Sequence, residues 1–209
     1  MMKILKDFAV FEGCDGSGTT TQLEILEKKF RASPSLPVLY RTFEPTDGPV
    51  GRLIRQGLAN EIPLKCETIA FLFAADRNEH VYGPGGIMEH TGRNELVVCD
   101  RYIFSSLVYQ GITCGEELPE RLNRDFPLPE LILYFDLDPE TAVKRLDKRS
   151  LKEIYETLEF QTRVRERYRT LLSGYPETCK VETIDASRTV EEVSCDVWRA
   201  LQKMPIFKV

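Results

Sequence analysis

Residues 13–20 read Gly13-Cys14-Asp15-Gly16-Ser17-Gly18-Thr19-Thr20 and match the phosphate-binding pattern G-x-x-x-x-G-K-[ST] at every fixed position but one. An apolar run at 8–11 precedes this loop, and a helical pattern opens at 19–21. Strand, glycine loop and helix in this order bring backbone N–H groups and the positive end of a helix onto phosphate oxygens. A simple tight turn is the alternative, but it does not account for the complete spacing. We therefore predict that the whole loop binds nucleotide phosphates.

The one departure from the pattern is Thr19, which stands where a lysine normally bridges the outer phosphates. Either another cation supplies that charge or phosphoryl transfer is impaired. Thr20 keeps the hydroxyl that usually binds Mg²⁺. The N–H dipoles of the loop would lower the pKa of the Cys14 thiol, although a small space-filling role is the favoured interpretation of this residue.

Length and charge restrict the class of protein. With 209 residues the chain suits one α/β domain, and its net charge of −5 offers no positive field to nucleic acid or to an anionic membrane. The six cysteines form no C-x-x-C pair, which indicates reduced thiols in a cytoplasmic protein. No long apolar stretch precedes the first expected strand, so we expect neither a signal peptide nor a membrane span.

Short apolar runs alternate with helical patterns along the chain, which predicts an α/β fold with a five-stranded parallel sheet and helices on both faces. Apolar residues at helical spacing predict amphipathic helices around 69–73 and 190–201, and Asp138-Pro139 is a typical helix start. Since no repeat or linker interrupts the pattern, 1–209 is predicted to be a single domain. The expected strands are 8–11, 38–43, 96–99, 131–137 and 181–184.

Residues 144–169 contain nine lysines and arginines in an otherwise acidic chain. One interpretation is a solvated helix face whose cations pair with the glutamates of the same segment. The other is a lid that closes over the nucleotide, because the segment follows the fourth expected strand. Both stay open, with the turn from Arg149 to Lys152 predicted to be functional and the later arginines structural.

The third expected strand runs into Asp100-Arg101, at the sheet edge where α/β proteins bind ligands. Asp100 is placed to organise Mg²⁺ beside the loop, and Arg101 to grip a phosphate with its guanidinium fork. The alternative is that Asp100 caps the helix expected near Ile103 and pairs with Arg101. The position at the strand end favours the functional interpretation.

Phe73 and Arg77 stand four residues apart on a predicted helix, so they can stack a base and read its edge. A phenylalanine on an apolar face is, however, more often part of the core. The glycine-rich stretch 83–86 lacks a preceding strand and is predicted to be a turn. His80 and His90 show no acid or cysteine partner at a useful spacing, and we assign neither a catalytic nor a metal role.

Taken in order, these motifs resemble those of bacterial thymidylate kinases, and the resemblance runs almost from end to end. That family transfers the γ-phosphoryl group of ATP to dTMP with Mg²⁺, giving dTDP on the way to dTTP. The resemblance therefore implies the P-loop kinase fold, a short basic lid at about 145–157 and a homodimer. The segments that carry it are 11–18, 20–22, Phe43-Glu44-Pro45, 51–55, 72–81, Asp100-Arg101-Tyr102, Tyr109-Gln110-Gly111, 128–131, Tyr155-Glu156, Gln161 and Ile184-Asp185-Ala186.

The resemblance also implies roles for residues of the acceptor site. Phe73 would stack on thymine and Arg77 would bind its edge, with Ser106 near the base. Tyr109 would pack under the deoxyribose and crowd out a 2′-hydroxyl. The dTMP phosphate would be held by Arg101 and Arg55, and the lid would add Tyr155 and Gln161.

For catalysis the resemblance implies Asp15 and Arg101 together with two lid cations, Arg149 and Lys152. The lid enters because Gly16 stands where some members carry an arginine. Thr20, Asp100 and Glu44 are the implied Mg²⁺ ligands. Thr19 departs from the family pattern, as does Phe43, where many bacterial members have arginine. Two alternatives remain: a deoxynucleoside kinase, which would want a carboxylate base near a 5′-hydroxyl, and a non-catalytic nucleotide-binding protein.

Overall fold

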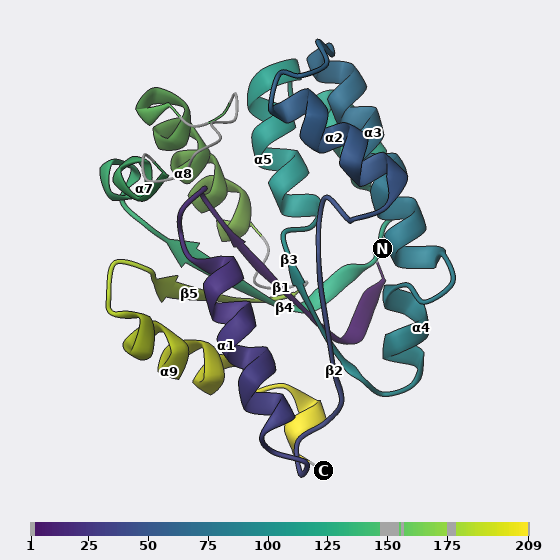
Figure 1. The fold of residues 1–209 in the computed structure, drawn as a ribbon, viewed down its shortest axis with the longest axis vertical. Helices are drawn as coiled ribbons and strands as arrows, with labels where there is room; N and C mark the ends of the chain where they lie inside the picture. Colours follow the sequence, from purple (N-terminus) through teal and green to yellow (C-terminus); the bar gives the residue numbers. More distant parts are fainter. Residues whose placement is uncertain (1–2, 147–154, 156, 175–178, 209) are drawn as a thin grey trace.

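The centre of the molecule is a parallel sheet of five strands in the order β2-β3-β1-β4-β5 (Figure 1). The computed structural model describes residues 3–146, 155, 157–174 and 179–208. Within this part of the chain the predicted α/β class, with its five parallel strands, is confirmed. The strands are β1 (Ile4–Gly13), β2 (Leu39–Phe43), β3 (Leu96–Asp100), β4 (Leu128–Asp136) and β5 (Lys180–Asp185).

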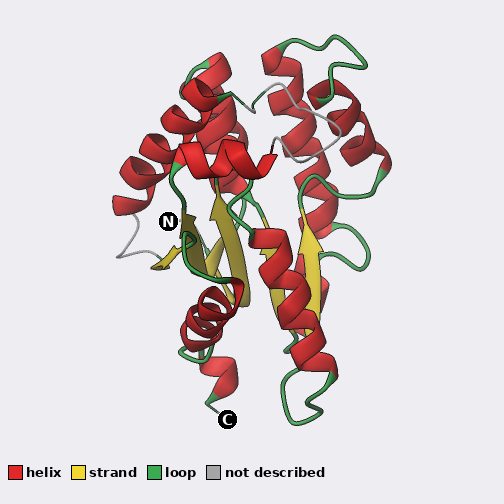
Figure 2. Cartoon of the chain, turned by 60° about the vertical axis from the view of Figure 1, so that its left-hand side comes forward, coloured by secondary structure: helices red, strands yellow, loops and turns green. Residues whose placement is uncertain are grey.

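Helices lie on both sides of this sheet (Figures 1 and 2). Helices α1 (Thr19–Arg31) and α9 (Val190–Leu201) pack against one another, and α5 (Ile103–Cys114) packs against α8 (Leu158–Ser173). The interior strand β3 is buried along its whole length, as expected for a parallel strand covered on both faces. The other helices are α2 (Pro49–Leu58), α3 (Cys66–Tyr82), α4 (Ile87–Gly92), α6 (Glu117–Asn123), α7 (Pro139–Leu146) and the 3₁₀ turn η1 (Pro205–Phe207).

Strand β1 begins four residues earlier than the apolar run 8–11 predicts. Asp7 interrupts the apolar pattern and adopts a left-handed φ of 59°, and the pairing with β4 shifts register between Leu5 and Ala9. The Asp7 N–H donates to Glu130 Oε2 at 2.9 Å, which replaces a ladder bond at this irregularity. The polar Asp7 at this irregularity therefore concealed the first residues of the strand from the apolar pattern.

The predicted helix starts and turns are mostly confirmed. Helix α7 begins at Pro139, and the Asp138 carboxylate accepts the Thr141 N–H at 3.2 Å. The stretch 83–86 is a turn, as predicted. On α9 the expected apolar face is buried except for Val190, which is 47% exposed at the first position of the helix. No helix in the described ranges is long and apolar enough to cross a membrane.

Candidate active site

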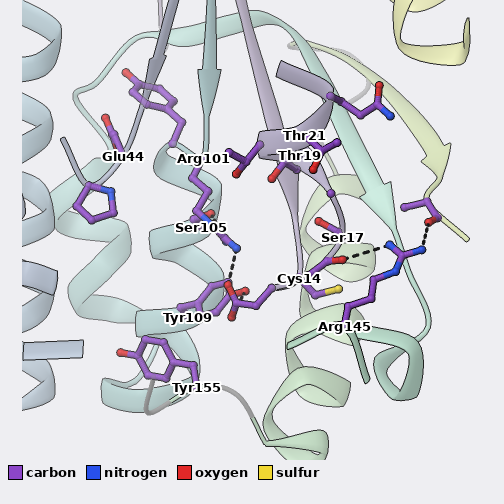
Figure 3. Close-up of a pocket in the computed structure, with 18 of the residues that line it drawn as sticks. Cys14, Ser17, Thr19, Thr21, Glu44, Arg101, Ser105, Tyr109, Arg145 and Tyr155 are labelled. Atoms are coloured by element: carbon purple, nitrogen blue, oxygen red, sulfur yellow. Dashed lines mark hydrogen bonds and ion pairs between the residues drawn. The ribbon is translucent and has the colours of Figure 1, made fainter. Parts of the chain in front are cut away.

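A cavity of about 560 Å³ opens at the carboxyl ends of β1 and β3 (Figure 3). The glycine loop 13–20 joins β1 to α1 and lines one end of the cavity from Cys14 onward. Phe73, Arg77 and Arg101 line it as well, although they come from α3 and from the turn after β3. The fold thus brings the loop and the predicted acceptor residues into one cavity, at the edge where parallel α/β sheets bind their ligands.

The loop has the backbone geometry that phosphate binding requires. Gly16 and Gly18 have φ values of 79° and 92°, in the left-handed region that favours glycine. Gly13 is held closely, because a Cβ there would lie 2.6 Å from Ser17 Oγ. Helix α1 begins at Thr19, so its first N–H groups point into the loop. The Ser17 hydroxyl is buried without a hydrogen-bond partner among the described residues.

Thr20 and Asp100 meet across the loop: Thr20 Oγ1 donates to Asp100 Oδ2 at 2.6 Å. The second carboxylate oxygen, Asp100 Oδ1, is buried and has no partner in the described part of the chain. Helix α5 instead begins at Ile103 without a side-chain cap, so the capping alternative for Asp100 is wrong. A hydroxyl and an unpartnered carboxylate oxygen beside a phosphate loop fit a Mg²⁺ ion, which needs one or two protein ligands and takes the rest from water and phosphate.

Glu44 is engaged differently from Asp100. Its carboxylate accepts from Arg77 Nη2 at 2.6 Å and from His80 Nδ1 at 3.0 Å, and all three side chains are buried. Burial alone would raise the pKa of Glu44, but the Arg77 and His80 partners outweigh it and lower the pKa. Both carboxylate oxygens are thus occupied by contacts with protein side chains. The three-carboxylate or histidine clusters typical of protein metal cages are absent from the described residues.

The two histidines have acidic partners that their sequence spacing did not reveal. His80 lies between Glu44 and Thr42, whose Oγ1 is 2.6 Å from His80 Nε2. His90 contacts Glu95 at 2.5 Å and stacks on Tyr40, with ring centroids 3.5 Å apart. Spacing along the sequence could not reveal the His80 partner, because that partner comes from a distant element. Neither contact forms a metal cluster among the described residues.

Arg77 is buried beneath the cavity and is fixed from several sides. Besides Glu44, it donates to Ser106 Oγ at 3.1 Å and to Asn123 Oδ1. Phe73 lies one helical turn earlier and is half-buried, with its side chain at the cavity. Phe73 and Arg77 thus lie on one face of α3, as predicted, and this face lines the cavity together with Ser106 of α5.

Arg101 and Asp15 form an ion pair at the centre of the cavity, with Arg101 Nη2 2.6 Å from Asp15 Oδ1 (Figure 3). Asp15 Oδ2 accepts from Tyr109 OH at 3.1 Å and from Gln161 Nε2 at 2.8 Å. Arg101 also lies over the Tyr109 ring, at 5.2 Å from its centroid. Four predicted site residues thus form one network, in which Arg101 pairs with Asp15 and not with its neighbour Asp100.

Arg55 and Tyr155 complete the rim of the cavity. Arg55 donates to the carbonyls of Thr46 and Pro45, which hold its guanidinium above the cavity. Tyr155 is buried and stacks on Phe160, with ring centroids 4.8 Å apart, beside Tyr109 at 5.5 Å. Gln161 is fully buried and donates to the Tyr155 carbonyl, so it lies behind the cavity wall.

Two of the four predicted catalytic residues, Arg149 and Lys152, lie outside the described residues, as does most of the predicted lid at 145–157. Arg145, which sequence reasoning did not select, lies on the loop itself. Its guanidinium donates to the Gly16 carbonyl and to the Ala186 carbonyl, each at 3.2 Å (Figure 3). Arg145 lies near the end of α7, the helix that follows β4, and β4 pairs with the strand that leads into the loop. This position in the predicted order of strands and helices could have identified it.

Three of the later arginines of the basic segment bind acidic residues that lie outside it. Arg165 and Arg169 both bind Asp136 at the end of β4, with closest distances of 2.7 and 2.6 Å. Arg167 binds Glu116 at 2.6 Å. These contacts tie α8 to the sheet and to the segment before α6.

Cys14 does not have the acidic thiol that the loop dipoles alone would give. Burial and the nearby Asp15 carboxylate raise the pKa of the Cys14 thiol to about 12. The side chain is 2% exposed and belongs to the core. The space-filling interpretation is the one that the structure supports.

A phosphate loop on a five-stranded parallel sheet, with a threonine–aspartate pair beside it and a second site across one cavity, defines the class of P-loop phosphotransferases. The family model of thymidylate kinase matches residues 11–197. Because that match covers most of the chain, this protein belongs to the thymidylate kinase family.

Individual relatives agree with this assignment. A protein of Treponema pallidum (strain Nichols) named as a thymidylate kinase is 44% identical over 92% of this chain and 93% of its own length. One from Pyrobaculum aerophilum with the same designation is 39% identical, over 96% of this chain and 99% of its own. One from Methanococcus maripaludis (strain S2 / LL) is 42% identical, over 81% and 79% respectively.

Proposed function

We propose that this chain transfers the γ-phosphoryl group of ATP to dTMP and releases dTDP and ADP. The observation that carries the proposal is the single cavity, lined by a phosphate loop and by an aromatic ring with two buried or half-buried arginines. In-line transfer needs donor and acceptor phosphates side by side in a site that excludes water. The family membership supplies the substrate class.

The donor half of the reaction is assigned to loop 13–20 and the first turn of α1. Their N–H groups would hold the β- and γ-phosphates, and Thr20 and Asp100 would hold Mg²⁺, which neutralises charge on the phosphate oxygens. Glu44 is left out of the metal ligands, because Arg77 and His80 occupy its oxygens. Arg145 is already placed on the loop, and Arg149 and Lys152 of the proposed lid would supply the charge that Thr19 lacks.

The acceptor half is assigned to the residues around Phe73. The Phe73 ring would stack on thymine, while Arg77 and Ser106 would bind the edge of the base. Arg101 and Arg55 would hold the 5′-phosphate, since a guanidinium fork binds phosphate oxygens in pairs. Tyr109 would lie under the deoxyribose, with Tyr155 and Gln161 closing the wall behind it.

Asp15 is assigned a role between the two halves. In the structure its carboxylate accepts from Arg101, Tyr109 and Gln161. It would therefore orient the acceptor phosphate through Arg101 and accept from the 3′-hydroxyl of dTMP when Tyr109 or Gln161 gives way. No general base is required, because a dTMP phosphate is already ionised at neutral pH.

A coupled assay with ATP and three acceptors tests this assignment. dTMP is expected to be the preferred acceptor, with dUMP weaker and thymidine inactive, because arginines occupy the position where a deoxynucleoside kinase would need a base. Thymidine as the best acceptor would establish the deoxynucleoside kinase alternative. Nucleotide binding without turnover of any acceptor would establish the non-catalytic one, with Thr19 as its cause.

The remaining assignments concern the whole protein. We propose that residues 1–209 act as one catalytic domain with a lid at about 145–157, in the cytoplasm, on small nucleotides and without nucleic-acid or membrane partners. We further propose that it works as a homodimer. Light scattering on the purified chain tests the dimer directly, with about twice the 24.0 kDa chain mass expected.

A further inference from the structure

Glu12 is a fully buried carboxylate in β1, one residue before the glycine loop. Three neutral donors surround it: the Tyr102 N–H at 2.8 Å, the Ser105 hydroxyl at 2.7 Å and the Tyr168 hydroxyl at 2.7 Å. A carboxylate is seldom fully buried, since it loses its hydration and needs strong compensation. The functional assignments above give Glu12 no role, and it does not line the cavity.

Glu12 holds the backbone on which Arg101 stands. Arg101 has a φ of 68°, in the left-handed region that an arginine rarely adopts, and such a conformation persists where its surroundings determine it. Two consecutive residues of β1 hold the Arg101 backbone in this conformation. The Phe11 carbonyl accepts the Arg101 N–H at 2.9 Å, and the Glu12 carboxylate accepts the Tyr102 N–H. The amides on both sides of the Arg101 Cα are therefore fixed by β1.

Glu12 also reaches the Arg101 side chain through Ser105. The Ser105 hydroxyl donates to Glu12 Oε2 and accepts from Arg101 Nη1 at 3.3 Å, so the carboxylate sets the direction of the hydroxyl lone pairs. Figure 3 shows Arg101 and Ser105 side by side on the wall of the cavity. The Arg101 guanidinium donates from there to Asp15 Oδ1 at 2.6 Å. Backbone and side chain of Arg101 are thus both connected to one buried group.

We propose that Glu12 is a positioning residue that fixes Arg101 in the conformation that binds the 5′-phosphate of the acceptor. It acts through the Tyr102 amide and the Ser105 hydroxyl and does not touch the substrate. The proposal rests on the proposed function, in which Arg101 holds the dTMP phosphate. A purely structural Glu12 would stabilise the fold without distinguishing ligands that carry this phosphate from ligands that lack it.

Calorimetric titration with dTMP and with thymidine separates these two roles. Glu12→Gln keeps the shape and one acceptor oxygen but replaces the other oxygen with an amide donor. The dissociation constant of dTMP is expected to rise by about tenfold or more, while that of thymidine stays within about twofold. Glu12→Asp, whose shorter side chain cannot reach both Tyr102 and Ser105, is expected to show the same selectivity and serves if Glu12→Gln does not fold.

Tyr168→Phe is the matched control. It removes one of the three donors to Glu12 and a 2.9 Å contact with Ser105 Oγ, but it keeps the bonds from the Tyr102 amide and the Ser105 hydroxyl to the carboxylate. Its dTMP affinity is expected to change by less than about threefold. Parallel losses for dTMP and thymidine in the Glu12 variants, or unchanged affinities with only a lower melting temperature, would overturn the proposal. A wild-type chain that does not phosphorylate dTMP would instead contradict the proposed function itself.

Discussion

The two ends of the cavity are built in different ways. The acceptor end consists of side chains fixed by buried charge, chiefly the Glu44–Arg77 pair with His80 behind it. The proposed donor end consists mainly of backbone, the loop from Gly13 to Thr20, whose N–H groups would bind phosphate. Because a backbone site does not depend on any one side chain, we expect it to tolerate Thr19 in place of lysine. A side-chain site loses both geometry and stability when one charge is removed.

The largest expected effect is therefore on stability, at the acceptor end. Glu44→Ala leaves Arg77 buried without its carboxylate, and we expect the free energy of unfolding to fall by about 3–5 kcal/mol. Urea unfolding followed by circular dichroism measures it. As a control, Glu27→Ala breaks the more exposed pairs with Arg31 and Arg41 and should cost about 1 kcal/mol or less. Equal losses of unfolding free energy in the two variants would mean that burial does not increase the cost of breaking the Glu44–Arg77 pair.

Arg101→Ala tests the point where the two ends meet. Loss of a desolvated, charge-assisted phosphate contact is expected to lower kcat/KM for dTMP by about 30- to 1,000-fold, corresponding to about 2–4 kcal/mol. The fold should stay largely intact, since Asp15 keeps its bonds from Tyr109 and Gln161. Steady-state kinetics with a melting curve checks both statements. A variant with near wild-type kcat/KM would remove Arg101 from the phosphate site.

The buried carboxylate behind Arg101 predicts a pH dependence of stability. Burial raises the pKa of Glu12 from 4.5 to about 7, although hydrogen bonds from Ser105 and Tyr168 and the charge of Arg101 partly oppose it. Between these two values the folded chain holds a proton that the unfolded chain has released. Stability from this group is thus greatest below pH 4.5 and is lost as the pH rises through about 7.

Glu12→Gln cannot titrate at this position, so its unfolding free energy should lack that slope. Relative to the variant, the wild-type chain is expected to lose on the order of 3 kcal/mol between pH 4.5 and pH 7.5. Urea titrations of both proteins at several pH values provide the comparison. Curves that stay parallel across this window would show that Glu12 is charged throughout.

Phe73→Ala separates the two ends by substrate. Only the acceptor base is expected to stack on this ring, at about 1–3 kcal/mol per base. KM for dTMP should therefore rise by about 5- to 150-fold while KM for ATP changes little. Initial rates at varied concentrations of each substrate decide the matter. An equal loss for both substrates would make Phe73 part of the core and nothing more.

The sequence predicted most of the fold because its strands are continuous apolar runs and its loop has a fixed spacing. The pairing of Thr20 with Asp100 was also predictable from the sequence. Asp100 ends β3 and Thr20 follows the loop after β1, and a parallel sheet brings both to one edge. The partners of the buried charged residues could not be predicted from the sequence. His80 meets Glu44 and Arg165 meets Asp136 across tertiary contacts, which spacing along one helix does not encode.

Arg145 and Glu12 illustrate the same limit within the site. In the sequence Arg145 is one of nine basic residues, and only the packing of α7 beside the loop singles it out. Glu12 reads as an ordinary residue of the motif, yet its three donors come from α5, α8 and the turn before α5. Local sequence patterns specify helices, strands and motif positions. The hydrogen bonds that hold the site residues in place depend on how distant elements pack.

The smallest expected effect is at the donor end. Thr19 is 7% exposed at the first position of α1 and lines the cavity, so a lysine there would point toward the outer phosphates. If lid cations already supply the missing charge, Thr19→Lys in the wild-type background should change kcat by less than about threefold. Arg149→Ala or Lys152→Ala should lower kcat with little change in KM for dTMP, the pattern of an interaction made chiefly in the transition state.

Combining these changes decides whether the donor end is compensated or defective. Thr19→Lys should partly restore kcat in the two lid variants, because a point charge returns to the outer phosphates of ATP. Rescue is expected to be incomplete, since Thr19 is buried and its surroundings fit a shorter side chain. Fully active lid variants, together with an acceleration of about a hundredfold from Thr19→Lys alone, worth about 2.7 kcal/mol, would contradict compensation. The loop would then bind ATP without completing the catalytic site. Thr19 in place of lysine would permit ATP binding but not efficient phosphoryl transfer.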